Sequence, residues 1–321
     1  MAGRRSKQSK GLAARLWHAS QPYRYLAPAA LLLLAFAVWP LIHAVNLSLR
    51  SHRGQQFVGL DNYATLLGGG EFWHALAVSV WYVIGTVPVT MLLGFLIACL
   101  LFQQLRARGM FRTIYFLPYV TSTVAAAMVF RWIFSNSESG AANTVLASLG
   151  AGPARWCHEQ TGVLTLLAEQ LGLQLPAWAA GPSLGLLCVM IFSVWHAIGF
   201  DVVIFLAGLS AIPREVYEAA EVDGANARQK IWHVTLPLLS PTLFFLAVIS
   251  TIRSFQTFNQ IFMMTPAGNR SSTMNLTMLI FKRFYEAPDY GIATAVAIVL
   301  FFIILALTIC QLRLLGPRVH Y

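Results

Sequence analysis

The segment Glu215–Pro241, EVYEAAEVDGANARQKIWHVTLPLLSP, decides how this chain is organised. It gathers four of the chain's 12 acidic residues within nine positions: Glu215, Glu218, Glu221 and Asp223. Such a concentration of charge is unexpected, because 57% of the chain is hydrophobic and only 11% is charged. The segment is therefore expected to lie in more polar surroundings than the rest of the chain.

Local sequence preferences predict two short helices in this segment. Pro213 fits the first turn of a helix, and the acidic side chains that follow it favour the positive end of the helix dipole. The first helix is expected to end near Asp223, where Gly224 can adopt a positive φ and turn the chain. Residues 225–234 can form the second helix. Val216, Ala219 and Ala220 lie on one face of the first helix, where small side chains permit close approach of another surface.

The composition outside this segment is that of a membrane protein. The mean hydropathy is +0.64 over 321 residues, and a spanning helix needs about 20 mostly apolar residues. Six stretches have that length: roughly 25–48, 75–102, 111–134, 183–209, 242–264 and 290–315. The sequence thus predicts an all-α integral membrane protein with six transmembrane helices, in which residues 25–321 form one domain.

The distribution of basic residues predicts the orientation. Cytoplasmic loops of membrane proteins are enriched in Lys and Arg, and a cytoplasmic N-terminus places 14 of the 22 basic residues inside: Arg4, Arg5, Lys7, Lys10, Arg15, Arg24, Arg106, Arg108, Arg112, Arg214, Arg228, Lys230, Arg313 and Arg318. Both termini and the acidic segment are then cytoplasmic. Because these residues are divided among loops, the net charge of +10 is assigned to membrane orientation and not to nucleic-acid binding.

Two further segments are separable by composition. Residues 1–24 are basic with interleaved apolar residues, which is typical either of a helix on the anionic inner leaflet or of a disordered leader. Residues 135–182 form a long outer loop that contains the apolar run GVLTLLAEQLGLQLPAW at 162–178. This run is too short to span, so it predicts an outer or interfacial helix.

The acidic segment also carries a family signature. Glu218-Ala219-Ala220, Gly224 after three further residues, and Ile231 through Leu236-Pro237 resemble the signature of permease subunits of binding-protein-dependent ABC importers. Similar stretches cover nearly all of the chain: FVGLDNYATLL, FRTIYFLPYV, VIFLAGLSAIPREVYEAAEVDGA, TLPLLSP and YGIATAVAIVLF. The whole pattern resembles the maltose-type, carbohydrate-uptake branch.

The resemblance implies the fold of type I importer permeases and a set of partners. Residues 213–234 would be coupling helices that dock in a cleft of a cytoplasmic ATPase dimer, with Glu218 facing a basic residue of the ATPase. Ala219, Ala220 and Asp223 would lie at the same contact, and Gly224 would make the turn. A second permease subunit, most often a different chain, and an extracytoplasmic binding protein complete the assembly in the bacterial inner membrane.

The same resemblance implies that this subunit does no catalysis. The chain has no G-x-x-x-x-G-K-[ST] phosphate loop, so ATP and Mg²⁺ would be bound by the ATPase and no cofactor or metal by this chain. Two departures fall on the outer side: Thr265-Pro266-Ala267-Gly268-Asn269 replaces the usual T-x-GGP, and the 135–182 loop is longer than usual. We expect this insertion to contact the binding protein.

Polar residues within the spans are the candidates for substrate binding, because such residues usually face a bundle interior or a water path. The fourth span places Ser193, His196 and Phe200 on one face, with Asp201 beside it, and the fifth carries a second polar face. The resemblance to maltose-type permeases implies that six residues stand at the positions that contact sugar in that branch: Ser193, His196, Phe200, Ser250, Ser254 and Thr257. Phe200 and His196 depart from the maltose pattern, and each lone Ser or Thr can also bond to its own helix.

Charged residues inside a span give a sharper indication. Arg253 and Asp201 are expected to pair with each other, with a partner subunit or with an anionic substrate, because an unpaired charge in the bilayer core costs several kcal/mol. The resemblance implies import of a carbohydrate, an oligosaccharide or sugar derivative, and Arg253 indicates that this substrate can be anionic, with a glycerol phosphate-type solute as an alternative. An ion-coupled secondary transporter is the rival class, and it would require discontinuous helices or paired repeats.

Overall fold

The computed structural model describes residues 25–52, 54–102, 108–170, 172–173, 180–265 and 271–316. Within these residues all regular secondary structure is helical. The predicted basic segment 1–24 and the stretch 266–269 lie outside the described residues, as does part of the predicted outer helix.

Four of the six predicted spans are single long helices, apolar enough to cross a membrane. The first is continuous over Tyr25–Ser48 and includes the π-helical turn η1 (Leu34–Val38) and helix α2 (Trp39–Ser48). The others are α4 (Gly70–Phe102), α9 (Leu184–Ala211) and α16 (Tyr290–Leu315). Helix α4 begins at Gly70 and not at residue 75, and the remaining bounds agree with prediction to within two residues.

The third predicted span, 111–134, is wrong as a single helix. It is divided into α5 (Arg108–Val120) and α6 (Thr123–Ile133), which meet at 93°. Pro118 lies within the last turn of α5, where it removes a backbone donor and disfavours continuation of the helix. Hydropathy alone does not detect this bend, because the residues on both sides of it are apolar.

The fifth predicted span, 242–264, is also wrong as a single helix. Helix α13 (Ser240–Phe255) is followed by a non-helical break at residues 256–258 and then by α14 (Asn259–Met264). On its other side, the helical stretch Ala227–Leu238 leads into α13 at an angle of 66°. The described residues thus contain four candidate spans, or up to six if each bent pair counts as one span.

Short helices join the spans at their two ends. Those at the end that was predicted to be cytoplasmic are α10 (Arg214–Val222), α11 (Ala227–Lys230), η4 (Ile231–Thr235) and α12 (Leu236–Leu238). Those at the opposite end are α3 (Asp61–Gly68), α7 (Ala141–Ser148), η2 (Trp156–His158), α8 (Val163–Gln170), α15 (Leu276–Phe281) and η6 (Lys282–Glu286). Helix α8 occupies the predicted outer run and is too short to span.

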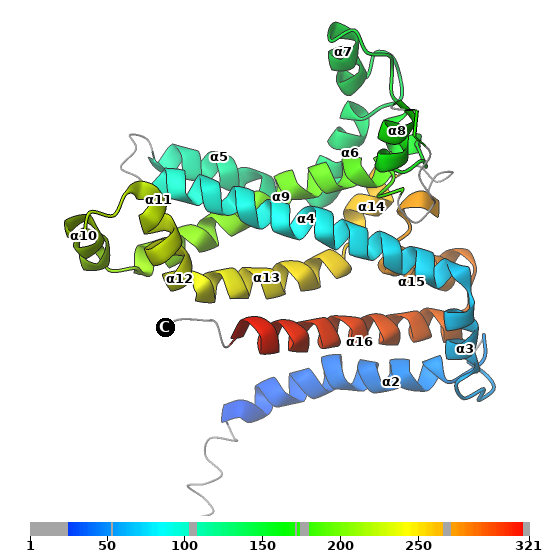
Figure 1. The fold of residues 1–321 in the computed structure, drawn as a ribbon. Helices are drawn as coiled ribbons and strands as arrows, with labels where there is room; N and C mark the ends of the chain where they lie inside the picture. The colour runs from blue at the N-terminus through cyan, green and yellow to red at the C-terminus, as the bar shows by residue number, and fades with distance from the viewer. Residues whose placement is uncertain are drawn as a thin grey trace, which may run out of the picture.

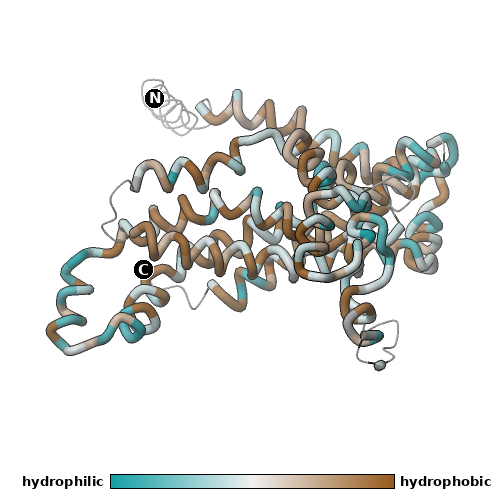
Figure 2. The backbone as a smooth tube through the Cα atoms, turned by 90° about the horizontal axis from the view of Figure 1, so that it is seen from above, coloured by the Kyte–Doolittle hydropathy of each residue, from teal (hydrophilic) through white to brown (hydrophobic). Residues whose placement is uncertain are grey.

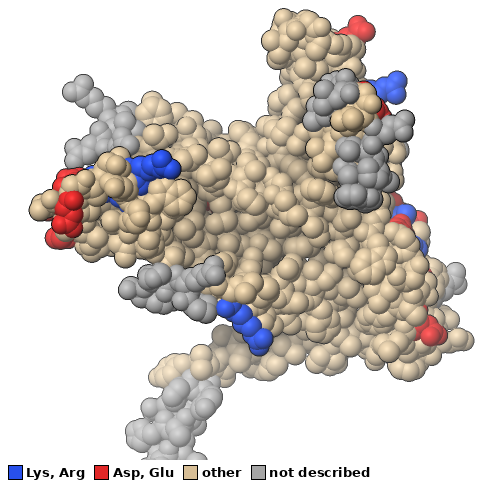
Figure 3. Space-filling model, viewed as in Figure 1, with Lys and Arg blue, Asp and Glu red and all other residues tan. Residues whose placement is uncertain are grey.

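The long helices run side by side, with the α10–α11 turn at one end of the molecule and α3, α7 and α8 at the other (Figure 1). The beginning of the first span, the α10–α11 turn and the end of α16 lie at one end, as an even number of crossings requires. Polar residues gather at both ends and apolar residues cover the middle (Figure 2). Acidic groups are clustered where α10 projects, and charged atoms are sparse over the long helices (Figure 3).

Close approach of helix backbones holds the centre together. Helix α4 packs along α9 through a buried cluster that includes Val202, Phe205 and Leu206. On another side, α5 lies against α9 at Gly199, where an added Cβ would meet the Tyr115 carbonyl oxygen at 2.2 Å and the Phe116 Cα at 3.0 Å. Only glycine fits there, which is how small residues permit helices to pack tightly in membranes.

We predict that Gly199→Ala will force α5 away from α9, because the nearest atoms belong to backbone and not to a flexible side chain. Overpacking of this kind costs about 1–3 kcal/mol. Gly109→Ala on α5 is the matched control, since its Cβ would meet nothing within 4 Å. Thermal unfolding of the detergent-purified protein should show a lower midpoint for Gly199→Ala only, and equal midpoints for the two variants would contradict this packing.

Candidate functional site

A polar cavity of about 160 Å³ lies between α4, α5, α9 and α13. All seven residues predicted to contact substrate line it: Ser193, His196, Phe200, Ser250, Arg253, Ser254 and Thr257. The remaining lining residues are Tyr82, Thr86, Thr90, Tyr119, Ala197, Asp201 and Gln260. The two polar faces that the sequence placed on the fourth and fifth spans therefore meet at one cavity. Substrate contact by these residues stays a prediction.

The wall contributed by α4 was not predicted. Tyr82, Thr86 and Thr90 follow one another at intervals of four residues, which places them on one face of α4. All three are buried, and the hydroxyls of Thr86 and Thr90 also bond to carbonyl groups of their own helix. The four-residue spacing of these polar residues in an apolar helix is visible in the sequence and could have predicted this wall of the cavity.

The Tyr82 hydroxyl ties three parts of the chain together. It donates a hydrogen bond to Ser193 Oγ of α9 at 2.8 Å, and it accepts from Thr257 Oγ1 at 3.4 Å and from Gln260 Nε2 at 3.3 Å. Thr257 lies in the break between α13 and α14 and not on a continuous helix face as predicted. Thr257 nevertheless reaches the cavity because the network around Tyr82 holds the break against α4.

His196 faces the bend of the third span. Its Nε2 lies 3.4 Å from Thr123 Oγ1 and 3.3 Å from the Thr121 carbonyl oxygen. The ring also packs near Phe192 and Tyr119. These contacts agree with the helix-packing interpretation of this residue, while its position in the cavity wall leaves the ligand-contact interpretation open.

Arg253 stacks on aromatic rings, and none of the ion pairs among the described residues includes it. Its guanidinium carbon lies 4.3 Å from the centroid of the Phe200 ring and 5.9 Å from that of Tyr119. Such cation–π contacts hold a charged group over an aromatic face while leaving its N–H donors available. Among the ion pairs of the described residues, none joins Arg253 to Asp201, so that expected pairing is not present.

Asp201 is a buried acid without a complete set of partners. The residue is 2% exposed, and its Oδ2 atom has no hydrogen-bond partner among the described residues. It lies beside Thr90 and close to Gly94, whose added Cβ would come within 2.8 Å of the Asp201 Cβ. A buried acceptor without a donor costs free energy. Asp201 is among the residues that line the cavity, although its Oδ2 atom itself has less than 1 Å² of accessible surface.

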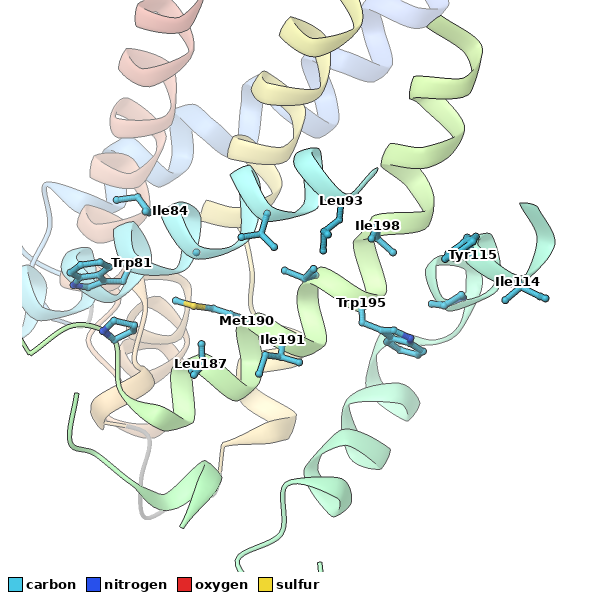
Figure 4. Close-up of a pocket in the computed structure, with 15 residues that line it drawn as sticks. Trp81, Ile84, Leu93, Ile114, Tyr115, Leu187, Met190, Ile191, Trp195 and Ile198 are labelled. Carbon is cyan, nitrogen blue, oxygen red and sulfur yellow. The ribbon is translucent and has the colours of Figure 1, made fainter. Parts of the chain in front are cut away.

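A larger, apolar groove lies next to the polar cavity. It has a volume of about 750 Å³ and is lined by Trp81, Ile84 and Leu93 of α4, by residues of α9 and by Ile114 and Tyr115 of α5 (Figure 4). Its lining contains no charged residue and none of the predicted substrate residues. A solute rich in hydroxyl groups would find few partners there, so the smaller polar cavity is the better candidate for such a solute.

The acidic segment forms a compact helix–turn–helix, α10 and α11, at the end of the molecule that was predicted to be cytoplasmic. Helix α10 ends in a Schellman motif: Ala225 N–H donates to the Ala220 carbonyl at 2.9 Å, and Gly224 N–H donates to the Glu221 carbonyl at 3.0 Å. Gly224 has φ +78°, as predicted for the turn. Asn226 and Gln229 form a capping box that begins α11. The turn is therefore specified by its own sequence.

This turn presents an uncovered surface. No residue of α10 is buried, and Val222 is 88% exposed. Glu218, Ala219, Asp223 and Gly224 are exposed, whereas Ala220 is partly buried. Glu221 is paired with Lys230 across the turn at 2.7 Å. None of the ion pairs among the described residues includes Glu218. Its side chain is exposed and lies next to the face formed by Val216, Ala219 and Ala220.

Comparison with known proteins gives the family. Residues 90–321 match the model of the "Binding-protein-dependent transport system inner membrane component" family. The arabinooligosaccharides transport system permease protein of Halalkalibacterium halodurans is 32% identical over 300 residues, covering 92% of this chain and 87% of that protein. The trehalose/maltose transport system permease protein of Thermococcus litoralis is 31% identical, covering 91% and 92%.

One solved structure shares the fold. A chain from the bacterial ABC transporter that imports the acidic polysaccharide alginate superposes with a TM-score of 0.76 at 22% identity, covering 94% of this chain and 99% of that chain. The likeness in fold therefore extends over nearly the whole chain. The family match, the two relatives and this fold agree. The chain belongs to the family of inner-membrane components of binding-protein-dependent transport systems.

Proposed function

We propose that this chain is the permease subunit of an ABC importer that moves a carbohydrate into the cytoplasm, with ATP hydrolysis on partner subunits driving the cycle. The convergence of seven polar or aromatic candidates on one cavity between the spans is the observation that carries the proposal. The permease relatives named above, whose systems carry arabinooligosaccharides and trehalose or maltose, support the same substrate class.

The chemistry of the cavity suits a sugar. Hydroxyl groups of Ser193, Ser254 and Thr257 can donate or accept hydrogen bonds, and Tyr119 and Phe200 offer aromatic faces to a sugar ring. At about 160 Å³ the cavity is smaller than the roughly 300–1,000 Å³ of ordinary ligand pockets. In this conformation it would hold about one sugar ring, so an oligosaccharide would be bound through one unit at a time.

The charges of the cavity favour a substrate derivative that carries an acidic group. Arg253 lines the cavity, and among the ion pairs of the described residues none joins it to Asp201. A carboxylate or phosphate would form charge-assisted hydrogen bonds with the Arg253 guanidinium. The permease for sn-glycerol 3-phosphate from Agrobacterium fabrum, 29% identical over 94% of this chain, supports the glycerol phosphate-type alternative.

Coupling to the ATPase is assigned to the α10–α11 turn. Its exposed small face and its free Glu218 carboxylate are suited to a groove with a basic residue, and Gly224 fixes the angle between the helices. Such a partner would also cover the exposed side chain of Val222. The remaining partners in this proposal are a second, different permease chain and a binding protein that docks near the 135–182 segment.

An ion-coupled secondary transporter is the rival function. Such a transporter requires broken helices or paired repeats, and the described residues contain broken helices at α5–α6 and at α13–α14. The family match favours the ABC importer, because it places this chain among proteins that act with a binding protein. The two functions differ in what drives uptake.

Reconstitution separates the two functions. Proteoliposomes that contain this chain, its partner permease, the ATPase and the binding protein should hydrolyse ATP faster when a matching oligosaccharide is added. Vesicles with this chain alone are the control and should take up no sugar under a proton or sodium gradient. Gradient-driven uptake by the chain alone would overturn the importer proposal.

Arg253→Gln tests the charge of the substrate. Loss of a hydrogen bond to a charged group costs about 1.5–3 kcal/mol, so uptake of an acidic sugar should fall roughly 10- to 100-fold while uptake of its neutral counterpart changes little. Arg253→Lys, which keeps the charge, is the matched control and should retain more of the acidic-sugar uptake. Unchanged uptake of the acidic sugar by Arg253→Gln would exclude an ionic contact.

Gly224→Val tests the coupling turn. A β-branched residue at φ +78° is strained by about 1–2 kcal/mol, so the turn should open and sugar-stimulated ATP hydrolysis should fall roughly tenfold. Gly224→Asn is the matched control because Asn tolerates this conformation. Open space around the Cβ position predicts normal membrane insertion of both variants, and full coupling in Gly224→Val would refute the assignment.

A further inference from the structure

Two cysteines that are distant in the sequence meet at the end of the molecule opposite the α10–α11 turn. Cys157 lies in the short helix η2 of the outer segment, and Cys188 lies in the first turns of α9. Both are buried, at 3% and 0% exposure, in one apolar cluster. Each side chain is a hydrogen-bond partner of the other, and no disulfide joins the two residues in this structure.

The surrounding backbone fixes this contact. Helix η2 packs on α9, and Gly185, one turn before Cys188, approaches the Cys157 carbonyl so closely that an added Cβ would lie 3.3 Å from its oxygen. Trp156, next to Cys157, is held by a hydrogen bond from its Nε1 to Asn143 Oδ1 at 2.8 Å. The two thiols are thus brought together by packing on both sides and not by chance contact of mobile side chains.

The chemistry around Cys157 favours reaction. The hydrogen bond from Cys188 and the nearby positive charge of Arg131 hold the pKa of the Cys157 thiol below its usual value, although burial opposes them. The thiolate is the form that attacks a disulfide. Extracytoplasmic compartments are oxidising, and disulfides form and persist there. The two cysteines are 31 residues apart in the sequence, so their contact depends on the fold.

We propose that Cys157 and Cys188 form a disulfide that fastens the outer segment to the outer end of α9. The Cys157 thiolate attacks the disulfide of an extracytoplasmic thiol oxidant, forms a mixed disulfide and releases one thiol of the oxidant. The Cys188 thiolate then attacks Cys157 Sγ and releases the second thiol. The two cysteines lose two protons and two electrons, and the oxidant's disulfide is reduced to two thiols.

The consequence is a covalent support for the segment that carries α7, η2 and α8. Helix α7 projects from the body of the molecule (Figure 1), and among its residues only Asn143 is buried. A link at Cys157 would hold the base of this projection against α9, whose polar face lines the cavity farther along the helix. The inference rests on the orientation given in the proposed function, which places this end outside the cytoplasm.

Counting thiols tests the inference. Cells are quenched with N-ethylmaleimide, and the full-length protein is denatured without reductant and its mass measured. Of the chain's 4 cysteines, two should be alkylated before reduction and all should become available after it. Modification of all four without reductant would overturn the proposal, as would a disulfide that joins two copies of the chain on a non-reducing gel.

Variants identify the pair and keep the test independent of orientation. In the Cys99→Ser, Cys310→Ser double variant no thiol should be modified before reduction, whereas Cys157→Ser should expose the thiol of Cys188 as an additional modified site. Glu138→Cys, placed in the exposed outer segment, reports the side of the membrane by labelling with an impermeant maleimide in intact cells. Outside labelling combined with four modified native thiols would reject the disulfide while leaving the importer proposal intact.

Discussion

A backbone carbonyl that loses its helical partner within a membrane must find another donor, because water is not available there. The break between α13 and α14 creates this problem at Thr257, and two side chains solve it: Asn275 Nδ2 donates to the Thr257 carbonyl at 2.7 Å, and the Thr277 hydroxyl donates to the same oxygen. Asn275 also caps α15 by accepting from Met278 N–H. The break is thus a specified feature, and the shape of the cavity depends on it.

The same break determines what the cavity can contact. Because α13 ends before Thr257, the residues after it do not follow the helical spacing of α13. The side chains of Thr257 and Gln260 instead donate hydrogen bonds to the Tyr82 hydroxyl of α4. The last turn of α13 then leaves Arg253 over the Phe200 ring of α9. A buried polar network stabilises the fold only when each of its polar groups has a hydrogen-bond partner. The Oδ2 atom of Asp201, on the α9 wall of the same cavity, has no hydrogen-bond partner among the described residues.

Periodicity predicted much of this arrangement, and its failures have physical causes. Ser193, His196 and Phe200 were placed correctly on one face because α9 is a continuous helix. The spans at 111–134 and 242–264 were predicted as unbroken because hydropathy averages over bends that Pro118 and the Thr257 contacts impose. Gly224 was predicted as a turn because a positive φ has few alternatives to glycine. The contact of Cys157 with Cys188 could not be predicted, since it requires the packing of η2 on α9.

The continuity of two helices relates the cavity to the opposite end of the chain. Helix α9 carries Ser193 and Phe200 and passes directly into α10 through Ile212-Pro213, while α13 carries Arg253 and is entered from α11 through η4 and α12. Tyr217 of α10 and Thr235 of η4 join the two paths through a contact of 3.2 Å between their hydroxyl oxygens. A partner that displaced the α10–α11 turn would therefore move both polar walls of the cavity together. Helices transmit such a displacement because their backbones are stiff, whereas the bend at Leu239 and the break at residues 256–258 supply the points at which α13 can reorient.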